Sequence, residues 1–96
     1  MKSEIETAIL SVCHEIGEES NIREMIHANA ETKLYGDAGC LDSIGLVFFI
    51  SAVEEKIGET FGKDIVLADE KAMSQRVSPF LSVNTLTDYI QGLLNN

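Results

Sequence analysis

The stretch Gly39-Cys40-Leu41-Asp42-Ser43-Ile44-Gly45-Leu46-Val47 decides the fold, because a polar, glycine-rich loop ends there and a long amphipathic pattern begins. The pattern places Ser43 at the N-terminus of a helix. The first backbone N–H groups of a helix have no partner within it, and the helix dipole favours negative charge there. The same groups would stabilise a phosphate attached to Ser43. The stretch therefore favours a covalently modified domain over an enzyme.

The helix after Ser43 is the clearest element of the chain. Its apolar residues recur at helical spacing and predict a buried stripe. Gly62 suits a C-terminal cap, although Gly58 inside the pattern leaves an earlier end at residue 57 open. The stripe consists of Leu46, Phe49, Ile50, Val53, Ile57 and Phe61.

The opposite side of this helix carries a second apolar patch, Ile44, Val47 and Phe48, beside Ser43. Further along the same side come Glu54, Glu55 and Glu59. Two interpretations are open. The patch either contacts the loop of residues 18–42, or it is a docking surface that is apolar near Ser43 and acidic at Glu54 and Glu55.

Helical spacing also predicts an N-terminal helix over residues 3–16, with Ser3 and Glu6 at capping-box spacing and Gly17 as its stop. Residues 18–21 look like a break, after which Ile22 to Ala30 form either a short second helical piece or a continuation of the first helix. The apolar positions of the first helix are Ile5, Ile9, Val12 and Ile16.

The long connection before Ser43 needs anchors, and we expect Leu34 and Leu41 to tie it to the core. After the long helix, residues 65–67 predict an extended connector, and Asp69 could cap a short helix through Met73. Ser82 then caps a last helix. Its inner side carries Val83, Leu86, Ile90 and Leu93, with Tyr89 alongside.

Length and charge limit the function. The chain has 96 residues and a formal net charge of −9, which predicts one domain over residues 1–96. Nucleic-acid binding needs a basic footprint, and an anionic membrane surface repels acidic chains, so we expect neither as a partner. The charge favours protein partners with basic patches, or serves solubility alone. We expect a monomer.

Spacing specifies neither a metal site nor an acid–base pair, so we expect no catalytic or metal-binding residue. Cys13 and Cys40 are interpreted as idle thiols in a reducing compartment, and His14 and His27 as surface residues. There is no apolar run of membrane-spanning length and no signal-peptide pattern, so we expect a cytoplasmic protein.

Residues 34–94 resemble the acyl carrier protein family, which includes the peptidyl and D-alanyl carriers. The resemblance is carried by Leu34-Tyr35-Gly36-Asp37, by Gly39 to Val47 with its Asp-Ser pair, and by the start of the last helix, Ser82 to Ile90. It implies an all-α fold, a four-helix bundle of acyl-carrier type with a long first loop and a short third helix.

The resemblance also implies that Ser43 receives 4′-phosphopantetheine from coenzyme A through a phosphopantetheinyl transferase that uses magnesium. Asp42 would help that enzyme engage the site, or is a plain turn residue. Ile44 matches the apolar position that partner enzymes grip. Ser43 is then an attachment point rather than an activated nucleophile, and no His or Lys is placed by motif to activate it. An ordinary helix cap is the alternative for Ser43.

Two substitutions and one longer segment set the chain apart from the common fatty-acid carriers. Gly45 and Phe48 stand where acidic residues are frequent, and the segment from Phe61 to Ser82 looks longer than in compact members. Both substitutions make the face near Ser43 less acidic. They indicate a specialised carrier with its own partner enzymes.

Three hypotheses follow. The first is a free-standing acyl carrier, loaded by an acyl ligase and serving synthase or transferase enzymes of fatty-acid, polyketide or related synthesis. The second is an aminoacyl or peptidyl carrier, including D-alanyl carriers, loaded by an adenylating ligase. The third is an acidic helical interaction module without a prosthetic group. For a carrier, the candidates to line a sheltered interior are Leu46, Phe49, Ile50, Val53 and Ile90.

Overall fold

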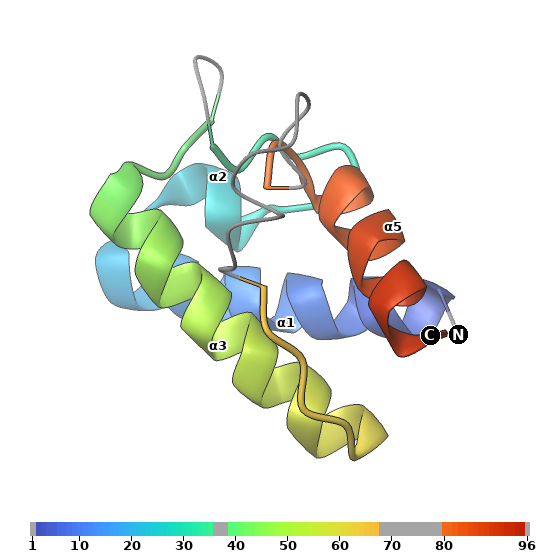
Figure 1. Cartoon of the computed structure of the whole chain (residues 1–96). Coiled ribbons are helices and arrows are strands. Elements are labelled where there is room, and N and C mark those ends of the chain that lie inside the picture. The colour runs from blue at the N-terminus through green and yellow to red at the C-terminus, as the bar shows by residue number, and fades with distance from the viewer. Residues whose placement is uncertain (1, 36–38, 68–79, 96) are drawn as a thin grey trace.

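The computed structural model describes residues 2–35, 39–67 and 80–95, apart from the side chain of Ser43. These residues form four helices, and their only β-type pairing is the isolated bridge between Lys33 and Ser82. The prediction of a mostly helical domain is therefore confirmed. The helices are α1 (Lys2–Ser20), α2 (Arg23–Ile26), α3 (Ser43–Phe61) and α5 (Val83–Leu94) (Figure 1).

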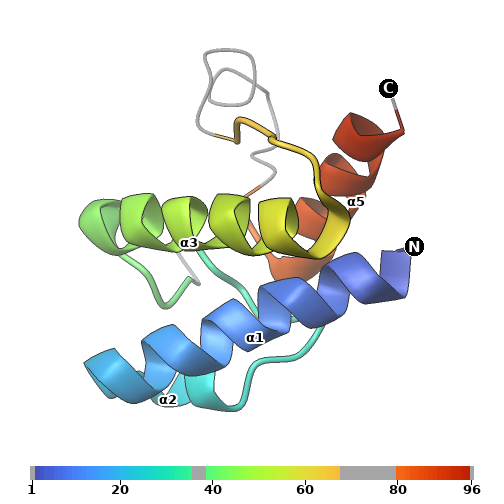
Figure 2. The same ribbon diagram turned by 90° about the horizontal axis from the view of Figure 1, so that it is seen from below.

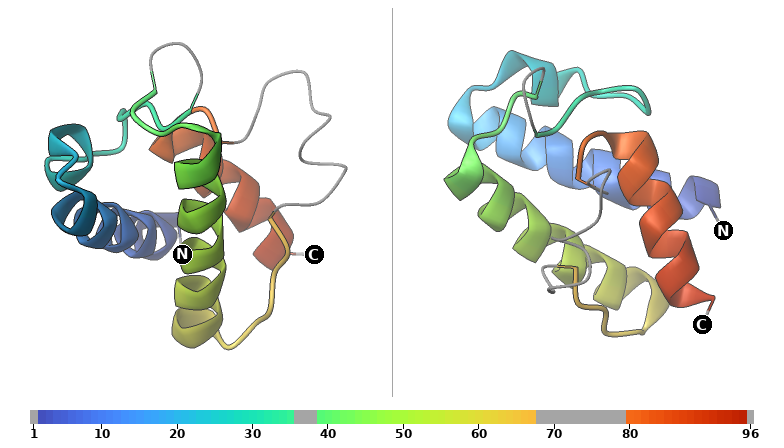
Figure 3. Two further views of the ribbon diagram at one scale, coloured as in Figure 1. Left: turned by 90° about the vertical axis from the view of Figure 1, so that its left-hand side faces the viewer. Right: turned by 45° about the horizontal axis from the view of Figure 1, so that its top comes forward.

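Helix α1 is the centre of the arrangement. Among the described helices it packs against each of the other three, and no other pair of them comes as close. Figure 2 shows α1 running beneath α3 and α5, and α2 lies beside the C-terminal end of α1 (Figure 3). The ion pair between Lys2 Nζ and Asp88 Oδ1, at 2.7 Å, joins the exposed start of α1 to α5. The apolar faces of α3 and α5 consequently both pack toward α1, and the hydrophobic core lies between these helices.

The prediction that Gly17 ends the first helix is wrong, because α1 continues to Ser20. The chain leaves the helix at Asn21, whose φ of 56° is left-handed. Beyond it, the N–H of Ile22 donates to the carbonyl of Gly17 at 2.9 Å, which is the bond of a Schellman cap. Asn tolerates that backbone conformation better than most residues. The sequence signal for the helix end was therefore Asn21.

Gly17 instead permits close packing of α2 on α1. A Cβ at this position would lie 2.6 Å from the backbone nitrogen of Ile26 and 2.9 Å from the carbonyl carbon of Met25. Met25 is fully buried, which explains why α2 must approach so closely. Of the two alternatives for residues 22–30, the short second helical piece is the one observed.

The loop between α2 and α3 is tied down at both predicted anchors. Leu34 and Leu41 are buried, and the N–H of Leu41 donates to the carbonyl of Leu34 at 2.9 Å. The N–H of Leu34 in turn donates to the carbonyl of Leu81 at 2.8 Å, and that of Val83 to the carbonyl of Thr32 at 3.0 Å. The loop is thereby bound to the start of α5.

Helix α3 runs its full predicted length and ends at Gly62, whose φ of 67° is left-handed, so the earlier end at residue 57 does not occur. Its stripe is buried except at Phe61, which is half-buried. Helix α5 begins with the predicted cap, and Ser82 and Thr85 complete a capping box. At the other end of α5, Leu93, which was expected on the inner side, is only half-buried. The neighbouring Leu94 is buried in its place.

Residues 63–67 connect from α3 without regular secondary structure, as the sequence indicates. Leu67 is fully buried, and Lys63 Nζ donates to the carbonyl of Leu94 at 3.0 Å. The short helix expected from Asp69 to Met73 lies outside the described residues. Phe80, which the sequence patterns did not single out, is also buried in the core.

We expect Gly17→Ala to destabilise the protein by about 1–3 kcal/mol, because the new methyl group would overlap the backbone of α2. The matched control is Gly92→Ala, at an exposed position of α5 where a Cβ would meet nothing within 4 Å. That change should stabilise the helix by about 0.5–1 kcal/mol. Urea unfolding of both variants measures the difference. Equal effects would contradict the packing role of Gly17.

Candidate functional site

Ser43 is the first residue of α3, and the residue that caps the helix is Asp42. Asp42 has extended backbone angles, and its Oδ1 accepts the N–H of Gly45 at 2.7 Å. That geometry is an N-cap. The alternative interpretation of Ser43 as the cap is therefore wrong, and the local structural role of Asp42 is that of the helix cap.

Gly45 lies against this cap. A Cβ at Gly45 would lie 3.1 Å from Asp42 Oδ1 and 3.4 Å from Leu41 Cδ2. The contact with Leu41 would be an ordinary one, and the Asp42 carboxylate would have to shift by a few tenths of an ångström. A side chain at this position therefore remains compatible with the Asp42 cap.

The second apolar patch of α3 is open to solvent. Ile44 is 70% exposed, Val47 63% and Phe48 69%. The alternative in which the loop of residues 18–42 covers the patch is therefore wrong. Large apolar side chains grouped beside one helix end are typical of an interaction surface.

Glu54 and Glu55, two of the glutamates assigned to the same face, differ in their surroundings. Glu55 is exposed, whereas Glu54 is half-buried. Glu54 Oε2 accepts the N–H of Leu67 at 2.7 Å and so holds the connector against α3. Glu54 therefore has a structural contact that the helical projection could not indicate, whereas the side chain of Glu55 faces solvent.

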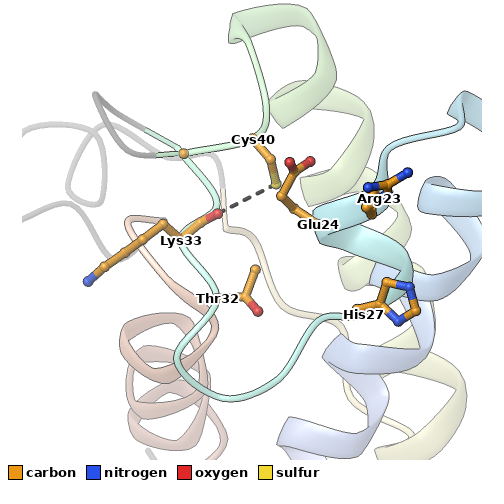
Figure 4. A pocket seen from close by; sticks show the side chains of 7 residues that line it. Arg23, Glu24, His27, Thr32, Lys33 and Cys40 are labelled. Carbon is orange, nitrogen blue, oxygen red and sulfur yellow. Dashed lines mark hydrogen bonds between the residues drawn. The ribbon is translucent and has the colours of Figure 1, made fainter.

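A groove of about 580 Å³ lies between α2 and the following loop (Figure 4). Cys40 Sγ reaches across part of it and donates to the carbonyl of Lys33 at 3.5 Å. Sequence reasoning missed this groove because its walls come from separate segments that meet only in the fold. The lining residues are Arg23, Glu24, His27, Thr32, Lys33, Gly39 and Cys40.

Burial disfavours the thiolate at both cysteines. It raises the pKa of Cys13 to about 12, with a smaller contribution from the nearby Cys40 thiol. Burial also raises the pKa of Cys40 above its ordinary value. Both side chains are therefore protonated at neutral pH and poor nucleophiles. His14 and His27 are exposed, as predicted.

The described residues contain no cluster of three or more His, Cys, Asp or Glu side chains that could hold a metal ion. Within the same ranges, no helix combines the length and the apolar character needed to cross a membrane. The five residues proposed for a sheltered interior all belong to the buried core cluster.

Comparisons with known proteins give no match: no family model, curated protein or solved structure is significantly similar to the chain. The residues and geometry around Ser43 are therefore the grounds on which a function can be assigned.

We expect Glu54→Ala to destabilise the protein by about 1–3 kcal/mol, because it leaves the Leu67 N–H without its acceptor. Glu54→Gln keeps an oxygen acceptor and should cost less. Glu55→Gln, at the exposed neighbour, should have almost no effect. Thermal unfolding of the three variants tests this order. An effect of Glu55→Gln as large as that of Glu54→Ala would contradict it.

Proposed function

We propose that this protein is an acyl carrier, modified on Ser43 with 4′-phosphopantetheine and presenting thioester-bound intermediates to partner enzymes. The observation that carries the proposal is the exposed patch of Ile44, Val47 and Phe48 beside the first residue of a firmly capped helix. A carrier needs this combination, because the modifying and consuming enzymes must all reach one attachment point.

The proposal fits the electrostatics of the helix start. The positive end of the α3 dipole lies at Ser43 and favours the negative charge of a phosphodiester. The Asp42 carboxylate already takes the Gly45 N–H, so its negative charge lies beside the attachment point. By the family resemblance, this carboxylate would also help the transferase and its magnesium ion engage the site.

The carrier's contribution is physical rather than catalytic. A tether keeps a reactive thioester at high effective concentration near each successive active site. The acidic chain, with its net charge of −9, would be steered toward basic surfaces on those enzymes. Phosphopantetheinyl transferase, loading ligases and synthases or transferases are the proposed partners, and the protein is proposed to act as a cytoplasmic monomer.

The residues support an aminoacyl or peptidyl carrier equally well, because that carrier needs the same serine and differs in its loading enzyme. The exposed patch also suits an acidic interaction module that works unmodified. In that module Phe48 would anchor a partner, and Ser43 would carry no group.

Intact mass separates the carriers from the unmodified module. Incubation with coenzyme A, magnesium and a promiscuous phosphopantetheinyl transferase should add one phosphopantetheine to the native chain. Ser43→Ala should gain none. Because the cap is Asp42, this variant should remain folded, which circular dichroism checks. A folded native chain that gains no mass would overturn the carrier proposal.

Phe48→Glu tests the partner face. The change restores the acidic character that is frequent in fatty-acid carriers, so we expect a several-fold rise in kcat/KM with a transferase specific for those carriers. The free energy of unfolding should change by less than about 0.5 kcal/mol, because the side chain is exposed. An unchanged kcat/KM would remove Phe48 from the partner face.

The adjacent phenylalanine provides the control. Phe49 is fully buried, so Phe49→Ala should cost about 3–5 kcal/mol. Phe48→Ala should be nearly neutral. Comparable losses in the two alanine variants would show that Phe48 belongs to the core.

A further inference from the structure

We infer that the groove lined by α2 and the loop before α3 is a docking site for the pantetheine arm itself. This inference rests on the proposed function, because it requires an arm on Ser43. The groove is a different surface from the exposed patch of α3. Its proposed ligand is the pantetheine portion of the arm, a neutral chain with two amide groups that ends in a thiol.

The groove lies within reach of the attachment point. Cys40 lines the groove and precedes Ser43 by three residues. Three residues span at most about 11 Å even when fully extended. Figure 4 shows the chain passing from Cys40 directly into the start of a helix, α3. A phosphopantetheine arm is longer than this separation, so its amide and thiol portions can enter the groove while its phosphate stays at Ser43.

The size of the groove suits the arm. Its volume of about 580 Å³ lies within the range of about 300–1,000 Å³ that is typical of small-molecule sites. The groove is an open trough rather than a closed cavity. A tethered ligand can therefore enter from the side without any opening of the core.

The lining provides hydrogen-bonding groups of both kinds. The Lys33 carbonyl and the Glu24 carboxylate are acceptors, and the Arg23 guanidinium is a donor. An amide chain carries both donors and acceptors, so it matches a mixed wall better than a purely apolar acyl chain does. In Figure 4 the Glu24 carboxylate lies beside the Cys40 thiol, and its charge contributes to the raised pKa of that thiol.

Backbone amide NMR gives the first test. Intact mass first establishes that the arm is attached. Holo-minus-apo shift differences should then extend from Ser43 to Glu24, Thr32 and Cys40. The internal control is the groove between α1 and α3, lined by residues that include Thr7 and Lys56, whose shifts should not change.

Disulfide competition gives the second test. We expect that Ser51→Cys places a thiol at an exposed position of α3, about 12 Å from Ser43 by the helical rise of eight residues. Diamide, an azodicarboxamide oxidant, takes one hydrogen from each of two thiols and becomes the hydrazine as an S–S bond forms. The arm thiol should join Cys40 in preference to the introduced cysteine, although Cys40 is the less exposed of the two. Peptide mapping after an acid quench identifies the product, and the apo variant reports any disulfide formed without the arm.

The outcomes are distinct. Shifts in the groove together with the Cys40 product support the inference. A holo-protein whose shifts stay near Ser43 overturns the docking site and leaves the carrier proposal intact, whichever cysteine the arm joins, because the raised pKa of Cys40 can by itself divert the arm thiol to the introduced cysteine. Absence of any mass gain overturns both.

Discussion

The geometry of the site depends on how the loop before α3 is pinned to the start of α5. The N–H of Leu34 reaches Leu81, the N–H of Val83 returns to Thr32, and the isolated bridge of Lys33 and Ser82 lies between these bonds. Backbone N–H and C=O groups that are removed from water need hydrogen-bond partners. Here the loop before α3 and the residues at the start of α5 supply these partners to each other. Because Leu41 then bonds to Leu34, the same pairing determines where α3 begins.

This pinning also separates the two surfaces that flank Ser43. The loop carries one wall of the groove, α2 carries the other, and α2 is held in place by its close approach to Gly17. The exposed patch belongs to the outer face of α3. Neither surface requires movement of the core, because α1 supports all three of the other described helices.

The helices were readable from the sequence because they follow local rules. The apolar stripe of α3, the Ser82 cap and the Gly62 end depend on residues within one helix, and the exposure of Phe48 beside buried Phe49 follows from the same periodicity. Most of the contacts that the sequence did not reveal are tertiary, although the Asp42 cap on Gly45 and the bond from Ile22 to Gly17 are local. Gly17 could be recognised as a packing position only once α2 was placed, and the bond from Leu67 to Glu54 joins residues on separate elements. The groove is hidden for the same reason.

The positions of the two surfaces impose an order on the proposed carrier cycle. A partner that grips Ile44 and Phe48 contacts residues of α3 that are not among those lining the groove. Docking of the partner therefore does not require the groove residues, and the arm can still occupy the groove at that stage. The arm must then leave its hydrogen-bonding groups to enter the partner's active site, so its affinity for the groove adds to the cost of delivery. Weak polar contacts in an open trough suit such a function better than a deep apolar cavity, because they slow exposure of the thioester without trapping it.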